Sequence, residues 1–175
     1  MDYGRFREYH EQNEADVTVS LLEVDRQHAS EYGIAEVDGD FRIRGFQEKP
    51  KDPKPIPDDP ERALASMGIY LFRTQVLLDV LKQTEHEDFG RDIIPKMYED
   101  LKVFAYPYRR YNEIQDYIHV VRDDGARQVQ FQQRTRDSQY WRHVGTLDAY
   151  WNANMDFTGV DPFFNTYGRL WPIRT

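Results

Sequence analysis

The sequence predicts an α/β fold in which helices flank a sheet, and three observations lead to this prediction. Short β-branched and apolar stretches of strand length recur along the chain. They alternate with stretches whose apolar residues repeat at helical spacing, as in layered α/β proteins. The composition, with 39% hydrophobic and 14% aromatic residues, is sufficient for a packed core. The 175 residues fit one domain or part of a larger one.

The first half of the chain is predicted to form one helix and four strands. The helix covers residues 3–14, with Tyr3, Phe6 and Tyr9 on one face. The expected strands are the β-rich segments 16–24, 33–37, 41–48 and 63–72. An Asp-Gly-Asp turn joins the second strand to the third. Three prolines within residues 51–59 predict a loop before the fourth strand.

A second helix is predicted to begin after Thr74, a good N-cap residue, and to run to about Gln83. Its apolar side chains recur at helical spacing and are expected to be buried: Val76, Leu77, Val80 and Leu81. Residues 92–101 suggest a third helix, because Pro95 falls near its first turn, where proline is tolerated. Residues 103–108 add a further strand to the alternating pattern.

Residues 109–139 contain a predicted β-hairpin. Two β-rich segments, residues 114–121 and 126–131, flank an Asp-Asp-Gly turn, and Asp-Gly between such segments is a strong hairpin signal. Two interpretations stay open. The segment is a surface hairpin inserted between two core strands, or it acts as a lid or an oligomer contact.

The segment YWRHVGTLDAYW at residues 140–151 is rich in aromatic residues. Residues 140–144 are expected to form a short strand, followed by a turn at Gly145 and a helix that begins near Thr146. Thr146 is a good N-cap, and Asp148 in the first turn suits the positive end of the helix dipole. Ligands of α/β proteins commonly bind where a strand end leads into a helix.

The charge and composition exclude several classes of function. A net charge of −8 without a basic tract disfavours binding to nucleic acid or to a membrane surface. The absence of cysteine excludes disulfides and thiolate metal sites. No apolar run reaches the roughly 18 residues that a membrane-spanning helix needs, and the N-terminal residues lack the apolar core of a signal peptide. We therefore expect a cytoplasmic protein.

Several polar residues near predicted strand and helix ends are candidates for ligand binding. Lys49 follows a strand and precedes Pro50, so it either meets a phosphate as a point charge or is a solvated surface lysine. Ser66 stands near a glycine, which permits close ligand approach, or else it serves in a local turn. Asp88 and Asp92 precede and begin the third predicted helix, where either can act as a cap.

Five short motifs are similar, in order and approximate spacing, to those of one known family: FQEKP (46–50), ASMGIY (65–70), DFGRDIIP (88–95), YWRHVGT (140–146) and WPIRT (171–175). Together they resemble the ADP-glucose pyrophosphorylase (glucose-1-phosphate adenylyltransferase) family and cover most of the chain except about residues 109–139. The resemblance implies that residues 1–175 form a partial Rossmann-like, GT-A-like nucleotidyltransferase sheet flanked by helices. The family's N-terminal nucleotide-loop half and C-terminal left-handed β-helix are expected to be lacking, with residues 156–175 as a linker toward that β-helix.

The resemblance also implies a reaction and a binding site. In the family, ATP and glucose 1-phosphate give ADP-glucose and pyrophosphate for glycogen or starch synthesis, with Mg²⁺ as cofactor. By the matching positions, Lys49 contacts the phosphate of glucose 1-phosphate, and Glu48 holds sugar hydroxyls. Ser66 and Gly33 are implied to bind the same ligand, although Gly33 equally suits a helix C-cap. Further residues are expected in the pocket wall: Asp88, Asp92 and Trp141.

His143 departs from the family, which has a magnesium-binding Asp at this position. Magnesium prefers hard oxygen ligands, and a neutral imidazole supplies no negative charge. The sequence also shows no counterpart of the family's glycine-rich nucleotide loop or of its second metal-binding Asp. We therefore expect the chain to carry the sugar-phosphate-binding part, to bind ATP only together with the missing N-terminal half, and to be inactive alone.

Two interpretations of this pattern stay open, in addition to a related uridylyl- or thymidylyltransferase. The chain is part of a longer or split adenylyltransferase, or it is a non-catalytic subunit that binds glucose 1-phosphate or regulates such an enzyme. In both cases it is expected to form homo- or hetero-oligomers with related subunits.

Overall fold

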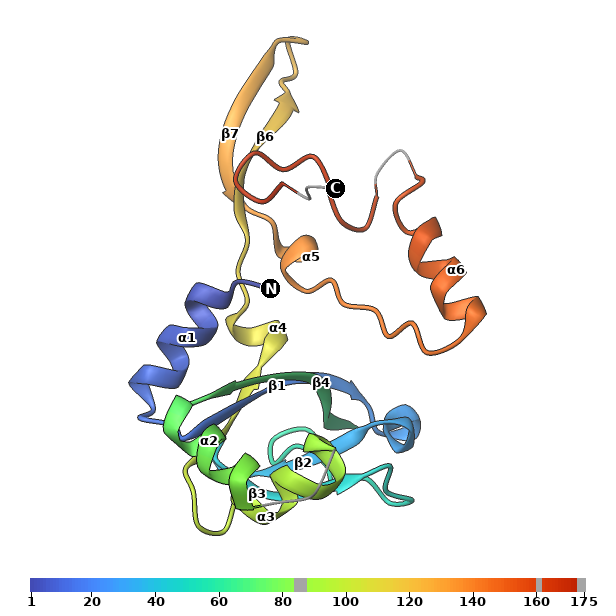
Figure 1. Ribbon diagram of the computed structural model, residues 1–175. Helices are drawn as coiled ribbons and strands as arrows, with labels where there is room; N and C mark the ends of the chain where they lie inside the picture. Colours follow the sequence, from blue (N-terminus) through green and yellow to red (C-terminus); the bar gives the residue numbers. More distant parts are fainter. Residues whose placement is uncertain (84–87, 160–161, 173–175) are drawn as a thin grey trace. The chain divides into compact units, whose positions relative to one another are not determined.

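The computed structural model describes residues 1–83, 88–159 and 162–172. The chain forms two compact units (Figure 1). The first, here called the sheet unit, comprises Tyr3–Tyr111 and contains a five-stranded sheet. The second, here called the hairpin unit, comprises Met1–Asp2 with Asn112–Thr175 and contains a two-stranded sheet.

The sheet unit is built on strands in the order β3-β2-β4-β1-β5. β1 and β5 pair in parallel, and the other three strand pairings are antiparallel. The strands are β1 Val17–Asp25, β2 Gly33–Val37, β3 Ile43–Glu48, β4 Arg62–Phe72 and β5 Val103–Pro107. Helices pack around this sheet, as Figure 1 shows, so the predicted α/β class is confirmed. Each strand lies within two residues of its predicted boundaries.

The sequence of β1 suits burial on both faces of the sheet. Its first six residues, VTVSLL, are all buried. The two hydroxyl groups in this run have hydrogen-bond partners, as buried polar groups require. Thr18 Oγ1 lies 2.8 Å from His10 Nδ1, and Ser20 Oγ donates to Met67 Sδ at 3.1 Å.

β4 contains a bulge that begins just after the residues that pair with β2. The register with β1 shifts there, since Val19 pairs with Tyr70 but Leu21 pairs with Ser66. Gly68 lies within the bulge at φ +69, a conformation that glycine adopts without a Cβ clash. On its other side β4 pairs with β2 at Leu64 and Ala65. Among the described strands, the second half of β4 therefore has β1 alone as a neighbour.

α1 (Tyr3–Gln12) docks through aromatic side chains. Phe6 is buried against Tyr106 with 5.0 Å between ring centroids, and the Tyr9 hydroxyl donates to the Ala105 carbonyl at 2.7 Å. The prediction placed Tyr3 on the same face, but its side chain is 65% exposed. The helix also ends two residues earlier than predicted.

The helical segments after β4 differ in part from the prediction. α2 (Thr74–Gln83) has the predicted bounds, and Val76 and Val80 pack against the core. Leu81, predicted to be buried, is 50% exposed. The single helix predicted at residues 92–101 is instead a π-helical turn, η2 (Phe89–Ile93), followed by the short α3 (Ile94–Met97). The short 3₁₀ helix η1 (Arg26–Glu31) and the helix α4 (Tyr108–Tyr111) complete the unit.

The apolar core lies in the sheet unit. Its buried members come from all five strands, from Ile56 and from the η2–α3 segment, and the largest fully buried ones include Leu21, Ile43, Leu64 and Ile94. No helix within residues 1–83, 88–159 and 162–172 has the length and apolar character that crossing a bilayer requires.

The hairpin unit contains β6 (Gln115–Val121) and β7 (Arg127–Gln133), paired antiparallel in the predicted hairpin. Gly125 takes φ +78 in the turn, and Asp124 Oδ1 accepts a hydrogen bond from the Ala126 amide at 3.0 Å. The unit also contains α5 (Thr135–Ser138) and α6 (Leu147–Met155). The hairpin therefore forms at the Asp-Gly turn that the sequence indicated.

Residues 140–144 form no strand, contrary to the prediction. Side-chain contacts hold this segment instead. The Tyr140 hydroxyl donates to Asp156 Oδ2 at 3.1 Å, and Arg142 forms two hydrogen bonds with the same carboxylate. The predicted start of the following helix is confirmed, because Thr146 Oγ1 caps α6 by accepting from the Ala149 amide at 3.1 Å.

Candidate functional site

Two predicted ligand-binding residues face each other where β2 begins and β3 ends. Gly33 pairs with Glu48 across the two strands. A Cβ atom at Gly33 would lie 2.7 Å from Glu48 Oε2 and 2.9 Å from the Phe46 ring. Gly33 is therefore required by close approach, which explains a glycine here better than the alternative C-cap role.

Ser66 lies on β4, and the structure adds a residue that the sequence prediction missed. The Tyr70 hydroxyl shares a hydrogen bond with Ser66 and lies near the carboxylates of Glu48 and Asp88. Burial is the main cause of the raised pKa of Tyr70, and these two carboxylates add to it. The motif at residues 65–70 could have indicated Tyr70, because it contains both Ser66 and Tyr70.

Asp88 and Gly90 form the third side of the site. Asp88 caps η2 by accepting a hydrogen bond from the Arg91 amide at 2.7 Å, so the capping interpretation is confirmed. The same carboxylate lines a small space at Gly90. A Cβ atom there would lie 3.5 Å from Asp88 Oδ1, 3.6 Å from Glu48 Oε2 and 3.7 Å from the Tyr70 hydroxyl. Three oxygens, from three segments of the chain, thus lie within van der Waals distance of one point.

Aromatic rings support this oxygen-lined space. The Phe89 ring lies 5.6 Å from the Tyr70 ring and 5.5 Å from the Phe72 ring. Both Tyr70 and Phe89 pack against the apolar core. The polar atoms of the site therefore lie next to packed apolar side chains, and this packing restricts their rotamers.

Lys49 follows Glu48 with an unusual backbone conformation. Its φ of +47 is uncommon for a residue other than glycine, and such outliers occur often at ligand sites. The Lys49 amide donates to the Tyr32 carbonyl at 3.0 Å and holds this turn. The side chain is exposed, and among the described residues no carboxylate forms an ion pair with its ammonium group. The ammonium is therefore available to an anionic ligand.

Asp92 contacts the site indirectly. Its carboxylate binds the Arg91 guanidinium through two hydrogen bonds of 3.1 Å each. The pKa of Arg91 is raised mainly by Asp92, with smaller contributions from Asp88 and Glu48. Asp92 thus positions a second cation beside the two carboxylates that line the Gly90 space.

Trp141 and His143 belong to the hairpin unit. Their rings stack with 6.1 Å between centroids, and the exposed His143 folds over Gly145. The described residues contain no group of three or more His, Cys, Asp or Glu side chains arranged to hold a metal ion. Within the described part of the chain, His143 is therefore not a member of such a group.

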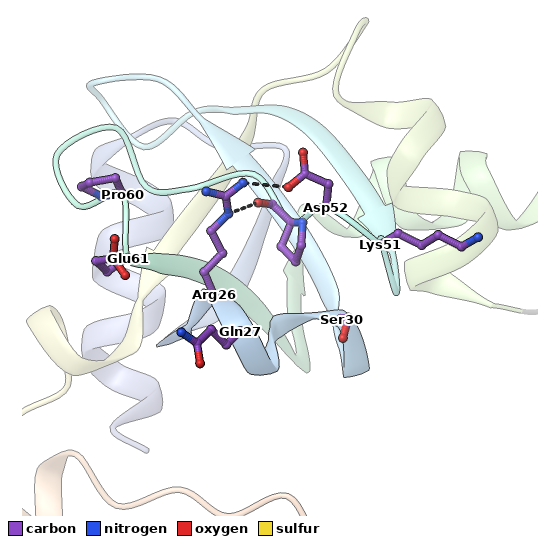
Figure 2. A pocket seen from close by; sticks show the side chains of 8 residues that line it. Arg26, Gln27, Ser30, Lys51, Asp52, Pro60 and Glu61 are labelled. Atoms are coloured by element: carbon purple, nitrogen blue, oxygen red, sulfur yellow. Dashed lines mark hydrogen bonds and ion pairs between the residues drawn. The ribbon is translucent and has the colours of Figure 1, made fainter.

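A separate open pocket of about 340 Å³ lies between η1 and the proline-rich loop (Figure 2). Arg26 reaches into it, but its guanidinium donates to Asp52 at 2.7 Å and to the Pro53 carbonyl at 2.8 Å. Its other charged lining residues, Lys51 and Glu61, are of opposite sign. Because its charges balance and no predicted ligand-binding residue lines it, we place the candidate site at Glu48, Ser66, Tyr70 and Asp88.

Comparisons with known proteins agree with the motifs. Residues 1–159 match the family model described as nucleotidyl transferase. The chain is 43% identical over 180 aligned residues to a glucose-1-phosphate adenylyltransferase of Rhodopirellula baltica, covering 100% of the chain and 35% of that protein. It is 43% identical to glucose-1-phosphate adenylyltransferase 2 of Alkalilimnicola ehrlichii and covers 37% of its length. The chain thus spans little more than a third of these relatives.

A solved structure shares the fold. The crystal structure of HddC from Yersinia pseudotuberculosis superimposes with a TM-score of 0.53 and 18% identity, over 90% of this chain and 50% of that one. At this identity the likeness concerns the fold alone.

Proposed function

The chain belongs to the nucleotidyl transferase family, and we propose that its sheet unit carries the glucose 1-phosphate-binding part of a glucose-1-phosphate adenylyltransferase. The observation that carries this proposal is the convergence of oxygens of Glu48, Tyr70 and Asp88 at Gly90. The exposed Lys49, adjacent to Glu48 in the chain, adds a cation for the phosphate.

The chemistry of these groups suits a sugar phosphate. Ionised carboxylates only accept hydrogen bonds, so Glu48 and Asp88 select ligands rich in hydroxyl donors. The Tyr70 hydroxyl both donates and accepts, which lets it share one sugar hydroxyl with either carboxylate. Lys49 supplies a point charge for the phosphate oxygens. Neutral sugars and inorganic phosphate would each engage only part of this set.

The whole reaction is part of the proposal. Glucose 1-phosphate would attack the α-phosphate of ATP and release pyrophosphate, a reaction that depends on positioning and charge neutralisation. The motifs of this chain include no glycine-rich nucleotide loop, so ATP binding is not assigned to its residues. Magnesium would neutralise phosphate charge in such a reaction. Among the described residues, no group of three or more His, Cys, Asp or Glu side chains is arranged to hold it.

One observation favours a second candidate function. His143 stacks on Trp141 where a carboxylate would be needed to bind metal. A chain that binds glucose 1-phosphate without turning it over would serve as a non-catalytic or regulatory subunit. Incubation with ATP, glucose 1-phosphate and Mg²⁺ separates the two candidates: pyrophosphate release contradicts the non-catalytic one.

Titration calorimetry with glucose 1-phosphate tests the shared part of the proposal. Lys49→Ala should weaken binding by about tenfold to a hundredfold, the usual effect of losing a hydrogen bond to a charged group. Lys51→Ala, which removes an exposed lysine two residues away, is the matched control and should bind like the unaltered chain. The proposal is wrong if glucose 1-phosphate does not bind, or if the two variants bind it equally well.

A further inference from the structure

In the hairpin unit, residues 162–172 are held against the base of the hairpin by two buried carboxylates. Asp116, near the start of β6, is 0% exposed, and Asp137, in α5, is 4% exposed. A buried carboxylate is costly unless hydrogen bonds satisfy it. Both carboxylates accept hydrogen bonds from residues 162–172, and in the described structure Asp116 Oδ2 stays without a partner.

Asp116 is the first attachment point. Its Oδ1 accepts hydrogen bonds from the amides of Arg169 and Leu170, each at 3.2 Å, and from its neighbour Tyr117 at 2.7 Å. Gly168 makes the approach possible, because a Cβ atom there would clash with Asp116 Oδ2. The Arg169 guanidinium also lies over the Tyr117 ring, 5.4 Å from its centroid. Residues 168–170 thus lie directly against the Asp116 carboxylate, and two of their amides donate to it.

Asp137 is the second attachment point. Its Oδ2 pairs with the Arg134 guanidinium at 2.7 Å and accepts a hydrogen bond from the Asn165 amide at 3.1 Å. The neighbouring Arg136 donates to the Pro162 carbonyl at 2.7 Å. Hydrogen bonds to residues 116–137 therefore recur along residues 162–170. The Phe163 amide donates to the Asp156 carbonyl at 3.0 Å, which adds a contact outside the hairpin.

Hydrogen bonding, rather than apolar burial, dominates these contacts. Within the described part of the hairpin unit, Ile114 is the one apolar side chain counted as buried, whereas Asn112, Asp116, Asp137 and Ser138 are buried polar ones. Apolar side chains in residues 162–172 stay largely exposed, including Phe163, Tyr167 and Leu170. The two carboxylates are therefore the buried acceptors of the attachment, next to a ring contact between Tyr140 and Phe164.

We propose that Asp116 and Asp137 form a two-point anchor, and that residues 112–139, which contain the hairpin, serve to fix the path of residues 162–172. This role differs from the lid, the oligomer contact and the simple surface hairpin that the sequence left open. It does not rest on the proposed function, because it concerns the hairpin unit alone.

Amide hydrogen exchange, followed residue by residue by NMR in the full chain, tests the anchor. Asp116→Ala should accelerate exchange of the Arg169 and Leu170 amides by about tenfold to a hundredfold, the effect of losing a hydrogen bond to a charged acceptor. The Asn165 amide should stay protected. Asp137→Ala should accelerate exchange of the Asn165 amide and leave exchange of the Leu170 amide unchanged.

Two further variants keep the test decisive. Asp123→Ala removes an exposed carboxylate at the hairpin tip and should leave all three amides unchanged. Gly168→Ala should expose the Arg169 and Leu170 amides without removing either carboxylate, because its Cβ displaces the segment from Asp116. Amides of β1 report whether the sheet unit stays folded. Unchanged exchange at Arg169 and Leu170 in both Asp116→Ala and Gly168→Ala would overturn the anchor.

Discussion

Tyr70 shows how a single side chain joins the parts of the candidate site. Its hydroxyl meets Ser66 on its own strand, and it lies near Glu48 from β3 and Asp88 at the start of η2. Its ring packs on Phe89 and the core, so the hydroxyl is held in place by apolar contacts. The sequence motif indicated Ser66 as a candidate, whereas in the structure Tyr70 is the residue that lies near all the others.

Tyr70→Phe should weaken glucose 1-phosphate binding by about threefold to tenfold with little loss of stability. The ring contacts remain, and the variant loses one hydrogen bond of ordinary strength. Calorimetry measures the affinity, and urea denaturation checks the stability. Tyr167→Phe, at an exposed position in the hairpin unit, is the matched control. Equal affinity of the two variants for glucose 1-phosphate would show that the Tyr70 hydroxyl does not contribute to binding.

At the scale of elements, the junction between α1 and β1 contains a titratable contact. His10, in the last turn of α1, lies 2.8 Å from the buried Thr18 hydroxyl of β1. Burial lowers the pKa of His10 from its ordinary value of 6.5, and Arg73 lowers it further, whereas Glu11 and Asp16 oppose the shift. Below about pH 6.5 the unfolded chain therefore binds a proton more readily than the folded chain does.

We expect the free energy of unfolding to decrease as pH falls from 7 through 6.5 toward 5, since protonation of His10 favours the unfolded state. His10→Gln should reduce this decrease, because glutamine does not titrate. His28→Gln, at an exposed position, should retain it. Urea denaturation at a series of pH values gives the comparison. Identical pH profiles for the two variants would contradict the role of His10.

Local sequence signals predicted some elements well and others poorly. The hairpin and the start of α6 depend on an Asp-Gly turn and on the Thr146 cap, both of which act within a few residues. The expected strand at residues 140–144 failed, because Tyr140 and Arg142 bind Asp156 and no strand pairs with the segment in the described structure. A strand needs a partner, and a short sequence window does not contain one.

At the scale of the whole molecule, apolar burial is concentrated in the sheet unit. Leu21 is fully buried in the core, whereas Leu147 in the hairpin unit is 88% exposed. Leu21→Ala should lower the free energy of unfolding by about 2–5 kcal/mol, because it removes buried methyl groups and leaves a cavity. Leu147→Ala, the same chemical change, should have an effect within about 0.5 kcal/mol.

Far-UV circular dichroism during urea denaturation is the appropriate measurement for this pair. All three Trp residues lie in the hairpin unit, so Trp fluorescence would not report the core directly. Comparable losses of stability in Leu21→Ala and Leu147→Ala would contradict the location of the apolar core in the sheet unit.

The sequence by itself determined the family, the α/β class and the strand order along the chain, because these depend on short motifs and on periodicity. It also indicated Glu48 and Ser66 as candidates, yet it could not show that both lie near the Tyr70 hydroxyl. Only the tertiary structure decided that grouping, together with the exposure of Leu81 and the anchoring of residues 162–172. The physical reason is distance along the chain: Asp116 and Leu170 are 54 residues apart, and a contact over that separation depends on how the intervening chain folds.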